Sequence, residues 1–256
     1  MQRFTDRRVL VTGGASGIGQ ATVLRLLAEG ATVVAADLAA EGLGETSKLA
    51  AQADSGDRLT TMTLDIADEN AVGEVVGDSI SRLGGLDVLV NAAGMLRGGH
   101  THEFSLELWN RILAVNITGT FLVTRAALPA LLDSGHGVIV NFSSTSASFA
   151  HPFMAAYSAS KGAVEAFTHS IALEYAKRGI RAVSVKPGSI SSGITNNFLQ
   201  FMPPDIDWSL LGKLSPALGE GFAAPETVAG VVAMLASDDG KFITGTEIRI
   251  DGGTHA

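Results

Sequence analysis

The sequence has 256 residues, of which 46% are hydrophobic and 17% charged, with a formal net charge of −8 and no cysteine. The absence of cysteine excludes disulfides, thiolate nucleophiles and cysteine metal sites. The negative charge and the lack of a basic cluster argue against binding to nucleic acid or to an anionic membrane surface.

Short apolar runs alternate with longer helical patterns along almost the whole chain. Apolar runs rich in β-branched residues predict strands at 8–13, 31–37, 59–65, 86–94, 137–144, 180–188 and 245–253. The segments between them predict helices at 17–29, 41–53, 68–83, 105–132, 155–178 and 225–236. This alternation predicts an α/β fold of right-handed βαβ units, with a parallel sheet covered by helices on both faces.

The domain organisation is predicted to be simple. The sequence shows no internal repeat, no low-complexity tract and no linker, so one domain over 1–256 is expected. The segment 191–224 interrupts the alternation because it is long, rich in Gly, Ser, Asn and Pro, and carries scattered large apolar residues. Long irregular segments inside compact domains are usually functional, and this one is expected to be a substrate-binding loop or lid. Packing of its apolar residues onto the domain is the alternative.

A glycine-rich turn, VTGGASGIGQA at 11–21, lies between the first predicted strand and the first predicted helix. Gly13 would allow a tight turn off the strand, whereas Gly17 and Gly19 would let the backbone approach a pyrophosphate at the helix N-terminus. Taken alone the pattern is also typical of an ordinary tight turn. Its place in the first βα unit of an alternating chain favours a dinucleotide site, with Ser16 and Ile18 inside the turn.

Asp37 ends the second predicted strand, at the distance along the chain expected for an acid that binds the adenosine ribose. Its alternative role is an ordinary turn or N-cap aspartate. A carboxylate here would repel a 2′-phosphate, and 9–24 contains no Lys or Arg to neutralise one. NAD(H) is therefore expected in preference to NADP(H).

Tyr157 and Lys161 stand four residues apart in AAYSASKGAVEAF, which places them on one face of a predicted helix. A nearby cation stabilises a phenolate and would lower the pKa of the tyrosine, making it a usable proton carrier. Ser144 ends the fifth predicted strand, at the sheet edge where open α/β folds bind ligands. The alternatives are a core aromatic for Tyr157 and a solvated helix residue for Lys161.

Four ordered motifs together resemble the short-chain dehydrogenase/reductase family: TGxxxGxG at 12–19, NAAG at 91–94, NFSS ahead of YSASK, and PGSISS at 187–192. The likeness extends from about residue 5 to ITGTEIRIDGG near the end of the sequence. It implies a Rossmann fold, doubly wound, whose seven-stranded, mostly parallel sheet has the order 3-2-1-4-5-6-7. It also implies a homotetramer or a dimer, in which 105–132 and 155–178 would pair across subunits.

The resemblance also assigns roles to individual residues. It puts Asn116, Ser144, Tyr157 and Lys161 in the catalytic set, with Lys161 on the nicotinamide ribose and Asn116 anchoring a water that links this lysine to solvent. A structural hydrogen-bonding role is the alternative for Asn116. The sequence departs from the family at Ala92, where a second Asn is common, and at Ser192, where Thr is usual. The cofactor residues implied are Asp65 and Ile66 against the adenine, Asn91 and Gly94 beside the adenosine half, and Pro187, Gly188, Ile190 and Ser192 around the nicotinamide.

The function expected is NAD(H)-dependent interconversion of a secondary alcohol and a ketone, with Tyr157 as general acid and base. The substrate is expected to be a free and fairly apolar small molecule, such as a hydroxysteroid, a cyclic alcohol or an acyl thioester. Reduction of 3-oxoacyl groups on acyl carrier protein is the alternative, although no Lys or Arg lies between Ala126 and Phe142 to dock that acidic partner. A remote alternative is an NAD sensor without activity.

Further expectations concern metals, membranes, location and self-association. His100 and His102 lack a nearby carboxylate set, so no metal site is expected. No stretch of about 20 apolar residues is evident, so no membrane-spanning segment is expected. The N-terminal sequence shows no signal-peptide pattern, and a cytoplasmic location is expected. The positive mean hydropathy of +0.28 suggests that self-association hides some of the surface.

Overall fold

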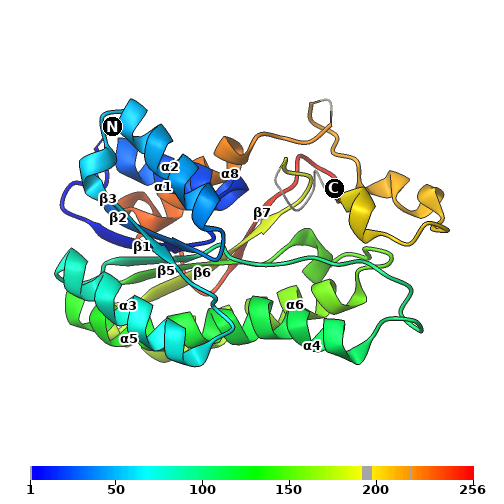
Figure 1. Ribbon diagram of the computed structural model, residues 1–256, viewed down its shortest axis with the longest axis horizontal. Coiled ribbons are helices and arrows are strands. Elements are labelled where there is room, and N and C mark those ends of the chain that lie inside the picture. The colour runs from blue at the N-terminus through cyan, green and yellow to red at the C-terminus, as the bar shows by residue number, and fades with distance from the viewer. Residues whose placement is uncertain (1, 192–197, 220) are drawn as a thin grey trace.

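The computed structural model describes residues 2–191, 198–219 and 221–256, and its centre is one seven-stranded sheet (Figure 1). Every pair of neighbouring strands is parallel, and the order is β3-β2-β1-β4-β5-β6-β7, which confirms the predicted fold class. The strands are β1 (Arg8–Thr12), β2 (Thr32–Asp37), β3 (Leu59–Thr63), β4 (Val88–Asn91), β5 (Val138–Phe142), β6 (Arg181–Pro187) and β7 (Glu247–Ile250).

Helices cover both faces of the sheet, as Figure 1 shows. One face packs on α1 (Gly17–Ala28), α2 (Ala40–Gln52) and α8 (Pro225–Ala236), and the other on α3 (Glu69–Leu83), α5 (Thr120–Ser134) and α6 (Ala155–Tyr175). Along β1 the side chains alternate between the two cores. Val9 and Val11 join the first core, whereas Leu10 joins the second. Because both faces of the sheet are buried, the sequences of the central strands are nearly continuous apolar runs.

The predicted helix at 105–132 is divided in the structure. It begins as α4 (Leu106–Leu113), passes through a π-helical turn at Ala114–Gly119, and continues as α5 to Ser134. A π turn inserts an extra residue into the helix and redirects the side chains around it, often at functional sites. The other predicted helices and strands differ from the structure by a few residues at their ends.

Within the described residues, the stretch Leu106–Ser134 is long and apolar enough, by length and composition alone, to cross a membrane. This differs from the expectation that the sequence holds no such stretch. The stretch is partly buried and packs against α3, α6 and the sheet, as a core helix does. Core helices of soluble proteins pass the same test, so the finding is weak evidence for a membrane-spanning segment.

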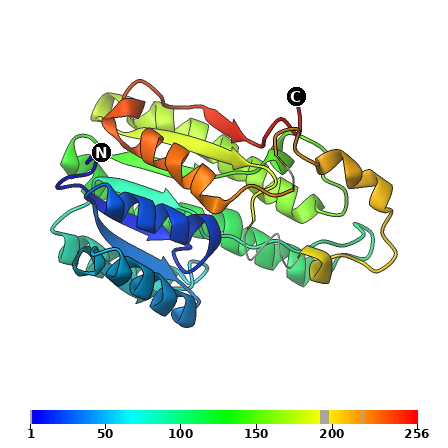
Figure 2. The ribbon, with the colours of Figure 1, turned by 90° about the horizontal axis from the view of Figure 1, so that it is seen from above.

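The segment after β6 contains three short 3₁₀ turns, Phe198–Phe201, Trp208–Leu210 and Gly212–Leu214. Figures 1 and 2 show it in gold at one end of the molecule, beyond the ends of the strands. Its end lies beside the C-terminal residues, because Ala217 and Leu218 both donate backbone hydrogen bonds to the Gly252 carbonyl, at 2.9 Å each.

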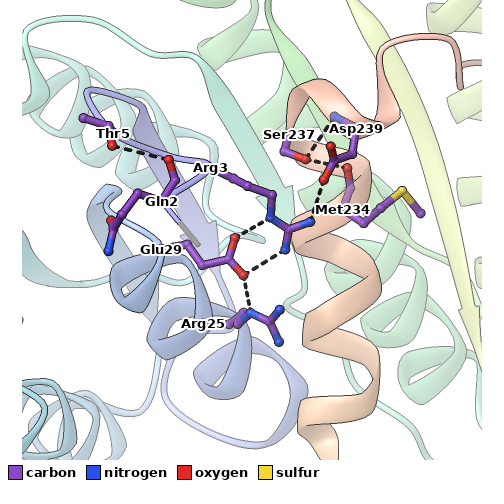
Figure 3. A network of polar contacts seen from close by, with 8 residues as sticks. All are labelled: Gln2, Arg3, Thr5, Arg25, Glu29, Met234, Ser237 and Asp239. Carbon is purple, nitrogen blue, oxygen red and sulfur yellow. Dashed lines mark hydrogen bonds and ion pairs between the residues drawn. The ribbon is translucent and has the colours of Figure 1, made fainter.

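A buried carboxylate ties the N-terminal segment to two helix ends (Figure 3). Glu29, just past α1, accepts hydrogen bonds from Arg3 Nε at 2.6 Å and Arg3 Nη2 at 2.8 Å, and also pairs with Arg25. Arg3 reaches on to Asp239 beyond α8, at 3.0 Å. The side chain of Glu29 is only 7% exposed, and the Arg3 hydrogen bonds lower its pKa. Because the Arg3–Glu29 ion pair is shielded from water, it is expected to contribute to the stability of the fold.

We predict that Glu29→Gln lowers the free energy of unfolding at pH 7 by about 2 kcal/mol, since two charge-assisted hydrogen bonds are weakened. Because the folded-state pKa of Glu29 lies below the unfolded value, its contribution is complete above about pH 4.5 and is lost as the pH falls through the folded-state pKa. Urea unfolding at pH 7 and pH 3 measures this. Asp239→Asn is the control: it should change the free energy of unfolding little, because the Asp239 carboxylate is 57% exposed. An equal loss for Glu29→Gln at both pH values would contradict the prediction.

Candidate active site

A cavity of about 530 Å³ lies at the carboxyl edge of the sheet, where the strand order reverses between β1 and β4. This is the switch point at which open α/β sheets bind ligands. Most of the residues proposed from the sequence meet in its wall, whichever strand or loop they come from. They are Gly13, Ser16, Gly17, Ile18, Gly19, Asp37, Asp65, Ile66, Gly94, Ser144, Tyr157, Lys161, Pro187, Gly188 and Ile190.

The glycine turn brings backbone segments into very close contact. Gly13 has a φ of 75°, and a Cβ atom there would stand 2.6 Å from the Ala93 amide nitrogen. A Cβ atom on Gly19 would stand 2.0 Å from the Gly13 carbonyl oxygen. The first turn of α1 carries no acidic side chain, and Ser16 at its N-cap makes no side-chain capping bond. The helix N-terminus therefore presents backbone N–H groups to the cavity, which suits the pyrophosphate of a dinucleotide.

Asp37 is held at the cavity wall by the backbone around it. Its Oδ2 accepts a hydrogen bond from the Ala15 amide at 3.1 Å, and its Oδ1 accepts one from the Ala39 amide at 2.9 Å. The next residue, Leu38, also lines the cavity and is 61% exposed. Neither neighbour of Asp37 in the sequence is a cation, because they are Ala36 and Leu38. A fixed carboxylate beside an apolar side chain suits ribose hydroxyls better than a phosphate.

Two arginines in the cavity wall were not proposed from the sequence. Arg111, on α4, pairs with Asp65 at 3.1 Å, so one expected adenine neighbour is engaged in an ion pair. Arg97 lies three residues after Gly94, and its guanidinium carbon stands 4.1 Å from the ring centroid of Phe201. The segment 9–24 around the glycine turn contains no Lys or Arg, whereas the fold brings these two arginines to the cavity from other segments of the chain.

The side chains of Tyr157 and Lys161 lie together at the start of α6, and Ser144 faces them from the end of β5. The Lys161 ammonium lies 5.8 Å from the centre of the Tyr157 ring and donates a hydrogen bond to the Phe142 carbonyl at 2.7 Å. The Ser144 Oγ accepts a hydrogen bond from the Ser146 amide at 3.2 Å. The three functional groups are thus each oriented by α6 or by the end of β5.

The charges at this site are governed mainly by burial. Burial raises the pKa of Tyr157, and the interaction with the Ser144 hydroxyl opposes that rise. Burial lowers the pKa of Lys161 to about 8, so most of it remains protonated at neutral pH. The expected lowering of the Tyr157 pKa by Lys161 does not appear; the ammonium donates its hydrogen bond to the Phe142 carbonyl. Among the described residues, the Ser144 hydroxyl is the group that lowers the pKa of Tyr157.

Asn116 is fully buried in the π-helical turn and does not line the cavity. Its Oδ1 accepts from the Met95 amide at 2.8 Å, and its Nδ2 donates to the Met95 carbonyl and to the Ser160 Oγ, at 2.9 Å each. A Cβ atom added to Gly94 would lie 3.2 Å from Asn116 Oδ1 and 3.3 Å from Lys161 Nζ. The amide therefore joins the turn after β4 to α6, the helix that carries Tyr157 and Lys161.

One other proposed residue, Asn91, does not reach the cavity wall. Asn91 is buried in the sheet, where its Nδ2 donates to Thr124 Oγ1 at 3.0 Å and to Asn141 Oδ1 at 2.9 Å. Only the backbone that follows it, from Ala92 to Gly94, lines the cavity. Ser192 lies outside the described residues.

A second cavity of about 390 Å³ adjoins the first and shares Ser144, Tyr157 and Gly188 with it. Part of its wall comes from the segment 191–224, through Trp208, Leu211 and other residues. A phenol that borders both cavities could exchange a proton with a molecule in the second while a dinucleotide fills the first.

The segment 191–224 is attached to the loop after β4 at several points. The Gly98 amide donates to the Phe201 carbonyl at 3.1 Å, and His100 Nε2 lies 3.0 Å from Asp205 Oδ1. The arginine–aromatic contact described above lies beside these bonds. His100 therefore has a local structural partner, and the described residues contain no group of three or more His, Asp or Glu that could hold a metal ion.

Comparison with known proteins supports the resemblance to dehydrogenases and reductases that the sequence motifs indicate. A family model described as enoyl-(acyl carrier protein) reductase matches residues 13–255. The 2,5-dichloro-2,5-cyclohexadiene-1,4-diol dehydrogenase LinX of Sphingobium indicum is 37% identical, over 98% of this chain and 97% of its own. The meso-2,3-butanediol dehydrogenase of Serratia marcescens is 38% identical, over 99% of this chain and 96% of its own.

A solved structure shows the same likeness in three dimensions. The crystal structure of a dehydrogenase/reductase from Sinorhizobium meliloti 1021 superposes with a TM-score of 0.88 at 33% sequence identity, covering 99% of this chain and 96% of that one. Its match to the whole chain agrees with the strand order and with the glycine turn after β1. The chain therefore belongs to the short-chain dehydrogenase/reductase family, and it is an oxidoreductase that acts on CH–OH groups with an NAD(P) cofactor.

Proposed function

We propose that this enzyme interconverts a free, uncharged secondary alcohol and its ketone, with NAD(H) preferred over NADP(H) and Tyr157 as general acid and base. The observation that carries the proposal is the position of Tyr157 and Ser144 at the border of the two cavities. One cavity is lined by the glycine turn and Asp37, and the other is mostly apolar. Two of the relatives act on diols by name, which agrees with an alcohol as substrate.

The proposed mechanism assigns one task to each side chain. Bound NAD(H) supplies or accepts the hydride. The Tyr157 phenol gives its proton to the substrate oxygen during reduction, and the phenolate takes it back during oxidation. The Ser144 hydroxyl hydrogen-bonds the same substrate oxygen and favours the phenolate. Lys161 remains largely cationic at neutral pH and adds positive charge near the phenol.

Residues around the cavity would hold the cofactor. The N–H groups at the start of α1 would bind its pyrophosphate, and Asp37 would accept hydrogen bonds from the adenosine ribose. Ile66 and the Asp65–Arg111 pair would border the adenine, whereas Pro187, Gly188 and Ile190 would surround the nicotinamide. We propose one NAD-binding domain over 1–256, in which 191–224 forms the wall of the substrate site.

The second candidate function is reduction of a 3-oxoacyl group carried by acyl carrier protein. A relative that is a 3-oxoacyl-[acyl-carrier-protein] reductase by name, FabG of Thermotoga maritima at 36% identity, favours it. Against it, 126–142 carries Asp133 and no Lys or Arg, so the end of α5 and β5 offers no basic dock. Salt-sensitive turnover of a carrier-bound 3-oxoacyl group, with none of free ketones, would favour this candidate. Tight NAD binding without turnover of any alcohol would favour a sensor.

Tyr157→Phe is expected to lower kcat for alcohol oxidation by about a thousandfold, because it removes the only proposed proton carrier. The affinity for NAD should change less than about threefold, since the ring that lines the cavity is kept. Stopped-flow or steady-state kinetics and NAD titration measure both quantities. Tyr175→Phe is the matched control, as the sequence has only two tyrosines. A Tyr157→Phe enzyme as fast as the wild type would refute the mechanism.

Asp37→Ala is expected to erode the preference for NAD over NADP by about tenfold or more, because it removes both the ribose acceptor and the repulsion of a 2′-phosphate. The dissociation constants of both cofactors, measured by fluorescence titration, give the ratio. Asp37→Asn keeps the shape of the side chain and removes its charge, so it separates repulsion from loop damage. An unchanged ratio in both variants would mean that Asp37 does not reach the ribose.

We also propose that the protein forms a homotetramer or a dimer through α4, α5 and α6. Phe121 is 41% exposed on α5, where it makes an edge-to-face contact with Phe167 of α6, and Leu173 of α6 is 82% exposed. Exposed apolar side chains gathered on neighbouring helices are typical of protein interfaces.

Light scattering at 10 µM is expected to give a mass of two or four times 26.4 kDa, and Phe121→Asp should shift it toward the monomer. The control is Lys48→Gln on α2, which also lowers the net charge by one, on the opposite side of the sheet. A monomeric wild type at this concentration would contradict the proposed assembly.

A further inference from the structure

The wall of the second cavity carries no formal charge at neutral pH among its described residues. Leu96, Met154, Trp208, Leu211 and Phe222 form much of it, and no Asp, Glu, Lys or Arg is among the lining residues. A volume of about 390 Å³ lies within the range of small-molecule sites. A substrate held here would be uncharged around its reacting carbon, since a buried unpaired charge is costly.

His151 differs in kind from the apolar residues and from the hydroxyls of Ser144, Thr145, Ser189, Ser215 and Thr254 that also line this cavity. Besides Tyr157 it is the only ionisable side chain among the described residues that line the second cavity. Its Nε2 lies 3.3 Å from the Oγ1 of Thr145, the residue directly after Ser144. A nitrogen-bearing ring therefore faces the same cavity as the Ser144 hydroxyl and the phenol.

The His151 ring is also held by neighbouring aromatic rings. The ring of His255 lies 5.6 Å away and tilted by 45°, and it stacks on Phe149 at a centroid distance of 4.1 Å and an interplanar angle of 3°. The Thr145 hydroxyl and the His255 ring thus limit the orientations open to His151. A ring that is fixed in this way can act as a specific hydrogen-bonding group rather than as a mobile side chain.

Burial and the proximity of His255 lower the pKa of His151 to about 4, so the ring is neutral at pH 7. A neutral imidazole has one N–H donor and one acceptor nitrogen. The Thr145 hydroxyl engages Nε2, whereas Nδ1 has no hydrogen-bond partner among the described residues. One ring nitrogen is therefore available to an uncharged oxygen of a bound molecule.

We propose that His151 hydrogen-bonds a second, non-reacting oxygen of the substrate, so that the preferred substrates are uncharged diols and hydroxyketones rather than simple alcohols. This inference rests on the proposed function, because it takes the reacting oxygen to lie at Tyr157 and Ser144. A largely apolar pocket in which a fixed, neutral ring presents a free nitrogen favours a ligand that pairs with that nitrogen. An analogue without the second oxygen leaves the imidazole unpaired and binds less well.

The test compares pairs of substrates that differ only in the second hydroxyl, namely cyclohexane-1,2-diol with cyclohexanol and butane-2,3-diol with butan-2-ol. The quantity measured is the ratio of kcat/KM for diol to kcat/KM for alcohol, with saturating NAD. The wild type should favour the diol by about tenfold or more. His151→Phe keeps an aromatic ring but has no ring nitrogen, and it should lower the ratio by about tenfold.

His151→Gln is the matched control, because its amide can still hydrogen-bond an oxygen, and it should retain most of the diol preference. Thr145→Val removes the hydroxyl that orients the ring and should lower the ratio in the same direction as His151→Phe. Thermal unfolding and NAD titration, with values close to those of the wild type, show that each variant is folded.

Equal ratios in the wild type and His151→Phe would overturn this inference and leave the proposed function standing. An equal fall in diol and alcohol turnover would also overturn it, since that result indicates a general packing role for His151. Failure of the wild type to oxidise any of the four compounds with either NAD or NADP would overturn the proposed function together with the inference.

Discussion

The close approach of backbone segments after β1 is the constraint on which the rest of the site depends. Gly13 and Gly19 leave no room for a Cβ atom against the turn after β4 and against the glycine turn itself. This contact brings the start of α1 and the segment 92–94 together at the point where the strand order reverses. Because the chain connections that follow β1 and β4 run in opposite directions along the sheet, a cavity remains between these connections. The backbone N–H groups, Asp37 and the beginning of α6 all border that space.

A network of short hydrogen bonds then sets the position of α6 against the sheet edge. Lys161 bonds the Phe142 carbonyl at the end of β5, and Asn116 joins Met95 to Ser160. The π-helical turn at Ala114–Gly119 contains this asparagine, so the irregularity of the helix lies at the point where its side chain is used. In this structure Asn116 positions the elements that carry the candidate catalytic groups and does not itself border the cavity.

Much of the fold and the glycine turn could be predicted because their signals are local. The alternation of strand and helix patterns gave the elements, and the motifs named above gave the family and with it the strand order. The π turn was not predicted, because AVNITG has no feature that separates it from an ordinary helical stretch. Arg97, Arg111 and His151 were missed for another reason. They reach the cavities through loops and helix faces whose positions depend on long-range packing, which a local pattern does not report.

The two cavities differ in the charge of their walls, and the difference suits a cofactor in the first and a substrate in the second. The first contains Asp37, Asp65, Arg97, Arg111 and Lys161, as a highly charged dinucleotide requires. The second has a single neutral imidazole in a largely apolar wall. Because a dinucleotide would place its charged groups among the charged residues of the first cavity, the reacting carbon can lie against the largely apolar wall of the second. In the proposed mechanism, the Ser144 hydroxyl, which opposes the rise in the Tyr157 pKa, would act on the phenol there. In the proposed function, the neutral His151 ring in that wall would be matched by an uncharged oxygen of the substrate, since a buried polar group without a partner is costly.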